Sequence, residues 1–275
     1  RVLAASTEIG QGTNTVFSQI VADALRIDYD LVEVQQPDTH IVPDSGPTVA
    51  SRTVMVVGKL IENAARDLVQ ILRSANLLDE KYSSEEFSDA CKKYVAEHGK
   101  LQVISQYQPP PMIRWDDKIY QGDAYASYAW AVYVADVQVD TSTYETEVKD
   151  FVALQEAGRI INPILAAGQI EGGVAQAIGY ALYEKVVWKN GRMINNQMTN
   201  YIMPTAVDIP DIRVHFIERN LNHGPAGAKG IGELPMDGPA PAILNAVRAA
   251  THVSPNSIPM LPEDLMQCMH ARARQ

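Results

Sequence analysis

Residues 128–140, which read YAWAVYVADVQVD, alternate between two sets of side chains, one of them Ala129, Ala131, Tyr133, Ala135, Val137 and Val139. A period of two residues is typical of a β-strand, because successive side chains point to opposite faces of a sheet. Residues 140–144 (DTSTY) are polar and favour a turn, and residues 145–155 return with an extended pattern. The stretch therefore predicts an antiparallel hairpin.

The chain after this hairpin predicts further regular structure. Asn162 can cap a helix that begins at Pro163, because proline suits the first helical position. This helix should extend to about Tyr183 although it contains four glycines, which indicate a close backbone approach by another element or by a ligand. Beyond it we expect a hairpin turn at 189–192, a strand at 212–218 and a helix at 241–251.

The chain before the hairpin predicts strands at 1–8 and 31–36, a helix from about 16 to 25, and a long helix at 50–74. Residues 75–122 are the least regular and hold one charged helical stretch near 85–98. Because strands and helices mix without a strict βαβ order, the predicted fold class is α+β, with mixed sheets and flanking helices in two lobes. We expect the lobes to span residues 1–122, including the irregular connection, and residues 123–275.

Charge and cysteine content narrow the function classes. The formal net charge is −10 over 275 residues, which disfavours nucleic-acid binding, and no apolar run is long enough for a membrane helix. Cys91 and Cys268 fit no metal-ligand spacing, and their small number indicates a reducing, cytoplasmic compartment. Two cysteines cannot hold an iron–sulfur cluster by four thiolates, so electron carriers would belong to other chains or domains.

Two glycine- or hydroxyl-rich segments precede predicted helices. Gly10, Gln11 and Gly12 form a strand-to-helix turn, where free helical amides suit an anion or an oxo group and the Gln11 amide can bind a ligand. Plain architecture also explains such a turn. The second segment could bind phosphate oxygens, or its hydroxyls could simply cap the helix; it consists of Val49, Ala50, Ser51, Arg52 and Thr53.

Two further segments carry acids. Gln169 and Glu171 lie in the glycine-rich helix, where a carboxylate could bind pterin nitrogens or could be a buried partner of Arg159. Gly232 and Glu233 follow a glycine-rich loop and precede an apolar, proline-containing run. Apolar surroundings would disfavour a charged Glu233 and make it a stronger base, whereas a helix-start acid is the simpler interpretation. The six histidines show no metal spacing, so no protein ligand to a metal is predicted.

Four segments in one chain, in this order, resemble the second molybdopterin-binding half of the xanthine dehydrogenase/aldehyde oxidase family. They are residues 8–12 (EIGQG), 158–163 (GRIINP), 168–173 (GQIEGG) and 229–233 (KGIGE), and the resemblance covers about residues 1–75 and 125–264. Each segment alone is weak. The P-loop lysine and the dinucleotide glycine spacing, which a nucleotide-binding alternative needs, are missing.

The resemblance implies a molybdenum–molybdopterin cofactor, either in that form or as the cytosine dinucleotide. Gly10, Gln11 and Gly12 would lie beside the metal, residues 49–53 at the phosphate end, and Gln169 in hydrogen-bond contact with the cofactor. Glu233, with Gly232 beside it, matches the family's catalytic base, which takes a proton from the oxygen nucleophile. The implied reaction is oxidative hydroxylation of a C–H carbon in a purine-like nitrogen heterocycle or an aldehyde, with water as the oxygen source.

The family's catalytic chain also has an earlier half that this sequence lacks. The resemblance therefore implies a fragment or a split subunit that works with a first-half molybdopterin subunit or domain, an iron–sulfur subunit and an FAD subunit. Iron–sulfur clusters and FAD are expected in those partners only. The alternative is a non-catalytic binding or assembly module that is inactive without the missing half.

Overall fold

The structure is a computed structural model that describes residues 1–116, 118–219, 221–254 and 256–274. The chain divides into two compact units, which we describe separately. Unit 1 contains residues 1–129, 157–165 and 218–230, and unit 2 contains residues 130–156, 166–217 and 231–275. A single division at residue 122 does not describe these units, because the chain returns to unit 1 twice after the hairpin.

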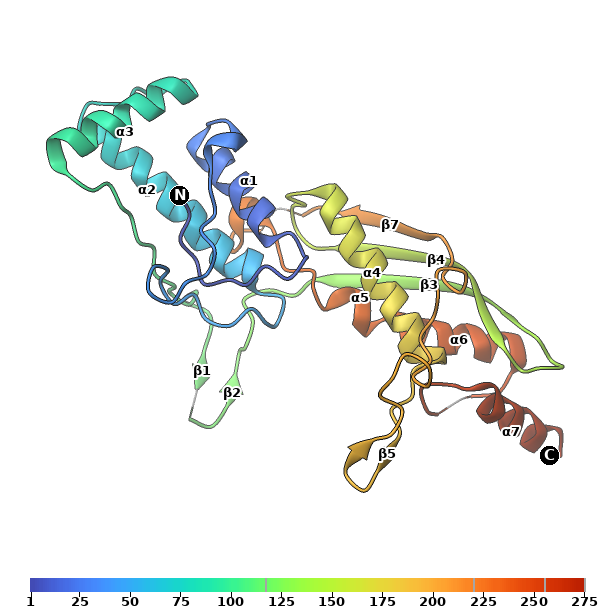
Figure 1. The fold of residues 1–275 in the computed structure, drawn as a ribbon. Coiled ribbons are helices and arrows are strands. Elements are labelled where there is room, and N and C mark those ends of the chain that lie inside the picture. Colours follow the sequence, from blue (N-terminus) through green and yellow to red (C-terminus); the bar gives the residue numbers. More distant parts are fainter. Residues whose placement is uncertain (117, 220, 255, 275) are drawn as a thin grey trace. The chain divides into compact units, whose positions relative to one another are not determined.

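The sheet of unit 2 is built on the hairpin (Figure 1). Strand β3 (Trp130–Val139) pairs antiparallel with β4 (Thr146–Glu156), and β4 pairs in parallel with β7 (Ile212–Ile217), so the sheet is mixed and its order is β3-β4-β7. The register shifts by one residue between Asp136 and Val137, and the extra residue in β4 places both Val148 and Phe151 on the buried side. The predicted α+β class with mixed sheets is confirmed.

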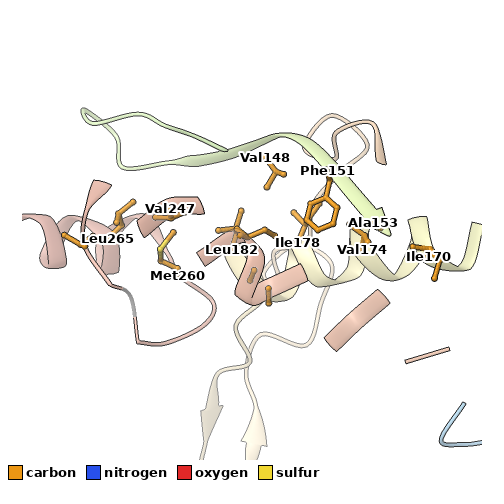
Figure 2. Packing of buried hydrophobic residues seen from close by; sticks show 14 residues of the cluster. Val148, Phe151, Ala153, Ile170, Val174, Ile178, Leu182, Val247, Met260 and Leu265 are labelled. Carbon is orange, nitrogen blue, oxygen red and sulfur yellow. The ribbon is translucent and has the colours of Figure 1, made fainter. Parts of the chain in front are cut away.

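Helices cover one face of this sheet. The other elements of unit 2 are α4 (Pro163–Leu182, whose first residues belong to unit 1), β5 (Trp188–Lys189), β6 (Arg192–Met193), α5 (Leu234–Asp237), α6 (Pro239–Thr251) and α7 (Pro262–Ala273). Figure 2 shows Val148 and Phe151 of β4 pointing toward these helices. They pack with Ile178 of α4 and Ile243 of α6 in one core, where Phe151 is fully buried.

Unit 1 is mainly helical. Its elements are α1 (Thr13–Leu25), η1 (Tyr29–Leu31), the π-helix η2 (Thr53–Gly58), α2 (Lys59–Ser74), α3 (Ser84–His98), β1 (Trp115–Asp116), β2 (Gln121–Gly122) and η3 (Pro225–Gly227). Helices α1 and α2 contact each other, and Leu25, Val69 and Leu72 share a core with Phe87 of α3. Ser83 and Glu86 form a capping box at the start of α3.

Two predicted strands are wrong. Residues 1–8 and 31–36 form one isolated parallel bridge between Val2 and Val34 instead of strands, and η1 occupies the start of the second segment. The backbone bonds around the bridge are few: Val2 donates to Glu33, and Gln35 donates to Val2. An apolar alternating pattern therefore buries side chains here without a neighbouring strand to extend the ladder.

The fully buried Phe151 provides a test of the unit 2 core. Phe151→Ala should lower the free energy of unfolding by about 3–5 kcal/mol, because it removes a large apolar side chain and leaves a cavity among α4 and α6. Urea unfolding followed by circular dichroism measures the change. Val207→Ala, at a residue that is 90% exposed, is the control and should change stability by less than about 0.5 kcal/mol. Equal effects of the two substitutions would contradict the packing described here.

Candidate functional site

An internal carboxylate organises the turn at residues 10–12. The Glu8 carboxylate accepts hydrogen bonds from the backbone N–H groups of Gly10 (2.8 Å), Gly12 (3.0 Å) and Asn14 (3.0 Å). Gly12, the N-cap residue of α1, has φ 87°, a conformation that glycine adopts without strain. The amides of this helix terminus are thus bonded to Glu8, as the architectural interpretation of the turn predicts.

The pKa of Glu8 reflects this arrangement. Partial burial opposes ionisation, but hydrogen bonds from the backbone amides of Asn14, Gly12, Gly10 and Thr13 outweigh it and lower the pKa below the ordinary value of 4.5. The negative charge also lies at the positive end of the α1 dipole. The turn is therefore held by a carboxylate that remains ionised at neutral pH.

Gln11 points into its own loop. Its Nε2 donates to the backbone oxygen of Thr7 (2.7 Å) and to Oγ1 of Thr13 (2.8 Å), and its Oε1 accepts from the N–H of Ile9 (2.7 Å). The side-chain amide that we expected to offer to a ligand is thus engaged inside the turn. A Cβ placed on Gly10, by contrast, would meet nothing within 4 Å, so the backbone of the turn is accessible there.

The loop at residues 45–53 joins this turn. Oγ of Ser45 accepts from the N–H of Ala5 (3.0 Å), and Oγ1 of Thr48 accepts from the N–H of Thr7 (2.9 Å). Thr48 therefore links the two loops. The first and second predicted segments are adjacent in unit 1.

Residues 49–53 themselves have an unusual backbone. Ala50 and Ser51 both have positive φ (55° and 50°), which side-chain-bearing residues rarely adopt, especially in succession. The Arg52 guanidinium donates to the backbone oxygens of Ser45 (3.1 Å) and Pro47 (3.2 and 3.3 Å), so it holds the loop closed. The helix predicted at 50–74 begins as the π-helix η2 at Thr53 and continues as α2.

Parts of the third and fourth segments also reach unit 1. A Cβ on Gly230 would lie 1.4 Å from the backbone oxygen of Ser51, so only glycine permits this contact. Gly158 forms an antiparallel bridge with Ala228, and the Nδ2 of Asn162 donates to Gln19 of α1 (3.1 Å). Residues 5–12, 45–53, 157–163 and 228–230 therefore lie together within unit 1.

Unit 2 contains Gln169 and Glu171 on one helix and Glu233 at the start of another. Helix α4 begins as predicted, with Oδ1 of Asn162 accepting from the N–H of Leu165 (3.0 Å), and it carries Gln169 and Glu171. A Cβ on Gly173 of this helix would lie 2.4 Å from Cγ of Pro235 in α5. At Gly173 the close approach inferred from the glycines is therefore made by α5, the element that follows Glu233, and at Gly179 it is made by Glu184 and Pro204.

Open space surrounds two other glycines of α4. A Cβ on Gly168 or on Gly172 would meet nothing within 4 Å. These glycines flank Gln169 and Glu171 on a helix surface that is half-buried to exposed. Glu171 is exposed, so it is not the buried ion-pair partner that the sequence left possible.

Glu233 is the N-cap residue of α5. Its backbone oxygen accepts from the N–H of Met236 (3.0 Å), so Glu233 lies at a helix start, as the simpler interpretation predicted, but its side chain forms no capping hydrogen bond with α5. Glu233 is exposed, so the chain itself does not provide the apolar surroundings that we predicted for this side chain. Gly232 is likewise exposed.

Tyr133 is a residue near Glu233 that the sequence did not single out. Its hydroxyl donates to the backbone oxygen of Leu234, and its ring would contact a Cβ on Gly238 at 2.2 Å, so it holds both ends of α5. Burial raises the pKa of Tyr133, which keeps the hydroxyl protonated and able to donate. The β-alternation placed Tyr133 on the inward face, but no local signal pointed to α5.

Other chemistry is limited in the described parts of the chain. Within residues 1–116, 118–219, 221–254 and 256–274, no group of three or more His, Cys, Asp or Glu side chains could hold a metal ion. A hollow of about 160 Å³ in unit 1, lined by Asp23, Glu62 and Arg159 among others, includes none of the predicted site residues. Over the same described residues, no helix is both long and apolar enough to cross a membrane.

Comparison with known proteins identifies the family. The molybdopterin cofactor-binding domain matches residues 1–210, and the chain belongs to this family. The match includes the turn at residues 10–12, the loop at 49–53 and both Gln169 and Glu171 of α4, and it ends before Glu233.

Individual relatives extend over nearly the whole chain. The chain is 30% identical to the putative xanthine dehydrogenase molybdenum-binding subunit XdhA of Escherichia coli, over 98% of this chain and 37% of that protein. It is 29% identical to the 6-hydroxypseudooxynicotine dehydrogenase complex subunit gamma of Paenarthrobacter nicotinovorans, over 94% of this chain and 34% of that protein. The chain thus spans little more than a third of these relatives.

Solved structures agree. Quinoline 2-oxidoreductase from Pseudomonas putida 86 superposes with a TM-score of 0.80 at 27% identity, covering 97% of this chain and 36% of that one. The predicted resemblance to the xanthine dehydrogenase/aldehyde oxidase family is confirmed at the level of the family.

The Glu8 carboxylate provides a pH-dependent test of the turn. Glu8→Gln should lower the free energy of unfolding near neutral pH by about 1 kcal/mol, the usual size of a lost helix cap. Because the folded pKa of Glu8 is lowered, the stabilisation is present above 4.5 and is lost as the pH falls through the folded value. The deficit of the variant should therefore shrink in acid.

Urea midpoints measured near neutral pH and below the ordinary carboxyl range report this deficit. Glu85→Gln, at an exposed acid in the first turn of α3, is the matched control and should change stability by less than about 0.5 kcal/mol. A deficit of the Glu8 variant that stays constant with pH would show that the charge does not hold the turn.

Proposed function

We propose that this chain supplies part of the molybdenum-cofactor site of an oxidative hydroxylase, with Glu233 as the catalytic base. One observation carries the proposal: within unit 2, the contact of Gly173 with Pro235 brings the helix of Gln169 and Glu171 against the element that begins at Glu233. Cofactor-binding and catalytic roles therefore fall on neighbouring elements.

The residues of the chain fit a pterin cofactor. The space at Gly168 and Gly172 leaves the surface of α4 accessible beside Gln169, whose amide can exchange hydrogen bonds with a ring, and Glu171, whose carboxylate can accept from ring N–H groups. In unit 1, Gly10 and the backbone of residues 49–53 are the groups that we assign to the cofactor. Gln11 and Arg52 hold these loops, and Gly12 provides the positive φ of the turn.

The reaction follows from the family and from the exposed acid. When bound, the molybdenum cofactor supplies the two-electron oxidant for hydroxylation of a C–H carbon with water as the oxygen source. In our proposal an Oε atom of Glu233, next to the exposed Gly232, accepts the proton of the oxygen nucleophile. The xanthine, nicotine-derived and quinoline names of relatives support a nitrogen heterocycle as substrate, with an aldehyde as the second class.

Partners complete the proposal. The exposure of Glu233 in this chain suits a site that is closed by another polypeptide, which we assign to a first-half molybdopterin subunit or domain. Iron–sulfur and FAD subunits would carry electrons away, as the name of one relative as a complex subunit supports. The cytosine dinucleotide form of the cofactor and a cytoplasmic location belong to the proposal as well; the free Cys91 and Cys268 support the latter.

Replacement of the proposed base tests the assignment. Glu233→Gln in the assembled enzyme should lower kcat by at least about 100-fold, because the amide cannot accept the proton, while molybdenum content stays unchanged. Glu263→Gln, an exposed acid in the first turn of α7, is the matched control and should retain full activity. Steady-state kinetics and elemental analysis are the measurements; near-normal turnover of the Glu233 variant would refute the role.

The molybdenum content of the purified chain shows whether the cofactor site needs a second polypeptide. The chain purified alone should carry little molybdenum, since Glu233 and Glu171 are exposed and further contacts to the cofactor are expected from the first half. Co-expression with the first-half polypeptide should restore loading, and Gly168→Ala should reduce it because a methyl group would intrude beside Gln169. Stoichiometric molybdenum on the lone chain would contradict the shared site.

A further inference from the structure

The sheet of unit 2 has one face covered by helices and one face that is not part of this core. Tyr133, Ala135 and Val137 of β3 point into the core with α4 and α6. The alternate residues Trp130, Val132 and Val134 point to the opposite face and are 70%, 58% and 58% exposed. Exposed side chains of this size, next to one another on a strand, are unusual for a solvated sheet face, which normally carries polar residues.

The strand register extends this apolar surface across the sheet. Val132 is opposite Leu154, which is opposite His215, and Val134 is opposite Val152, which is opposite Arg213. The row of Trp130 continues through Glu156, a charged residue that is only 9% exposed, to Ile217, which is 44% exposed, so the apolar surface ends at this row. We call this surface the outer sheet face: Trp130, Val132, Val134, Val152, Leu154 and Ile217.

Polar residues border the outer sheet face. Arg213 forms an ion pair with Asp150, and His215 and Asp136 are exposed on the same side. An apolar centre with a polar, charged border is the usual anatomy of a protein–protein interface. The arrangement also argues against a membrane-facing surface, which would lack the charged border at strand level.

The exposed area of the chain points the same way. The chain exposes 17,016 Å². Two separate folded bodies of half its mass would together expose only about 14,200 Å². The excess, roughly 2,800 Å², is of the order that obligate interfaces bury.

We propose that the outer sheet face is the docking surface for the first-half molybdopterin polypeptide. This inference rests on the proposed function, in which the chain works together with that polypeptide. The lengths of the relatives indicate the occupant. This chain matches 37% of the Escherichia coli relative and 36% of the quinoline 2-oxidoreductase chain. Nearly two thirds of each relative therefore lies in other parts of the same polypeptide. A polypeptide of that size offers a partner large enough to cover the outer sheet face.

Hydroxyl-radical footprinting of the unmodified protein tests the docking surface. Trp130 and Trp188 are 70% and 67% exposed, so in the chain alone they should oxidise at similar rates. In the assembly with the first-half polypeptide, Trp130 should oxidise at least about fivefold more slowly, because an interface core excludes solvent. An unchanged rate for Trp130 would overturn the proposal.

Two other results would also overturn it by identifying a different occupant. Slow oxidation of Trp130 in the chain alone, at every protein concentration, would show that the chain covers its own sheet. Protection in the chain alone that disappears on dilution would show that a second copy is bound. None of these readouts depends on turnover, so they are separate from the test of Glu233.

Charge substitutions give an independent measurement. Val132→Lys should reduce co-purification of the first-half polypeptide at least about tenfold, because it places an ammonium group in an apolar interface. Val207→Lys, on a residue of the same unit that is 90% exposed, is the matched control and should co-purify as the unmodified chain does. Equal co-purification of both variants would exclude this face as the docking surface.

Discussion

Close contact between backbones, possible only at glycine, underlies the arrangement of the predicted site. A Cβ on Gly230 would overlap the backbone oxygen of Ser51, and a Cβ on Gly158 would lie 2.0 Å from the backbone oxygen of Gly227. These contacts return two late segments of the chain to unit 1, where they join the turn at residues 10–12 and the loop at 45–53. Without these contacts, motifs that are distant along the chain would not lie close together in space.

The Glu8 carboxylate determines the shape of the turn before α1. Helix N-termini attract negative charge, and the sequence was compatible with an external oxo or phosphate group at α1. The structure uses a side chain four residues before the N-cap for that purpose. The groups of the turn that a ligand can reach are consequently backbone atoms such as those of Gly10, and the polar side chains Glu8 and Gln11 maintain its shape.

The sequence predicted the elements whose patterns are long and local. The hairpin of β3 and β4, helix α4 with its Asn162 cap, and the turn between β5 and β6 appear within one or two residues of their predicted positions. Helix α5 was missed because four residues containing a proline have no periodicity, and the strands at 1–8 and 31–36 failed because a strand needs a partner that sequence patterns do not reveal. Likewise, Glu8 bonds to backbone amides of the turn at residues 10–12, and Tyr133 bonds to the backbone oxygen of Leu234. The sequence did not indicate these contacts.

The carboxylate in the turn before α1 has a consequence for the order of assembly. A loop that is closed by its own charge reaches its final geometry during folding of the polypeptide, with no need for a cofactor to induce it. The entropy of ordering these residues is then lost before the cofactor arrives, and insertion becomes the docking of a rigid molecule onto a preorganised surface. In the proposed site, folding of this turn therefore precedes binding of the cofactor.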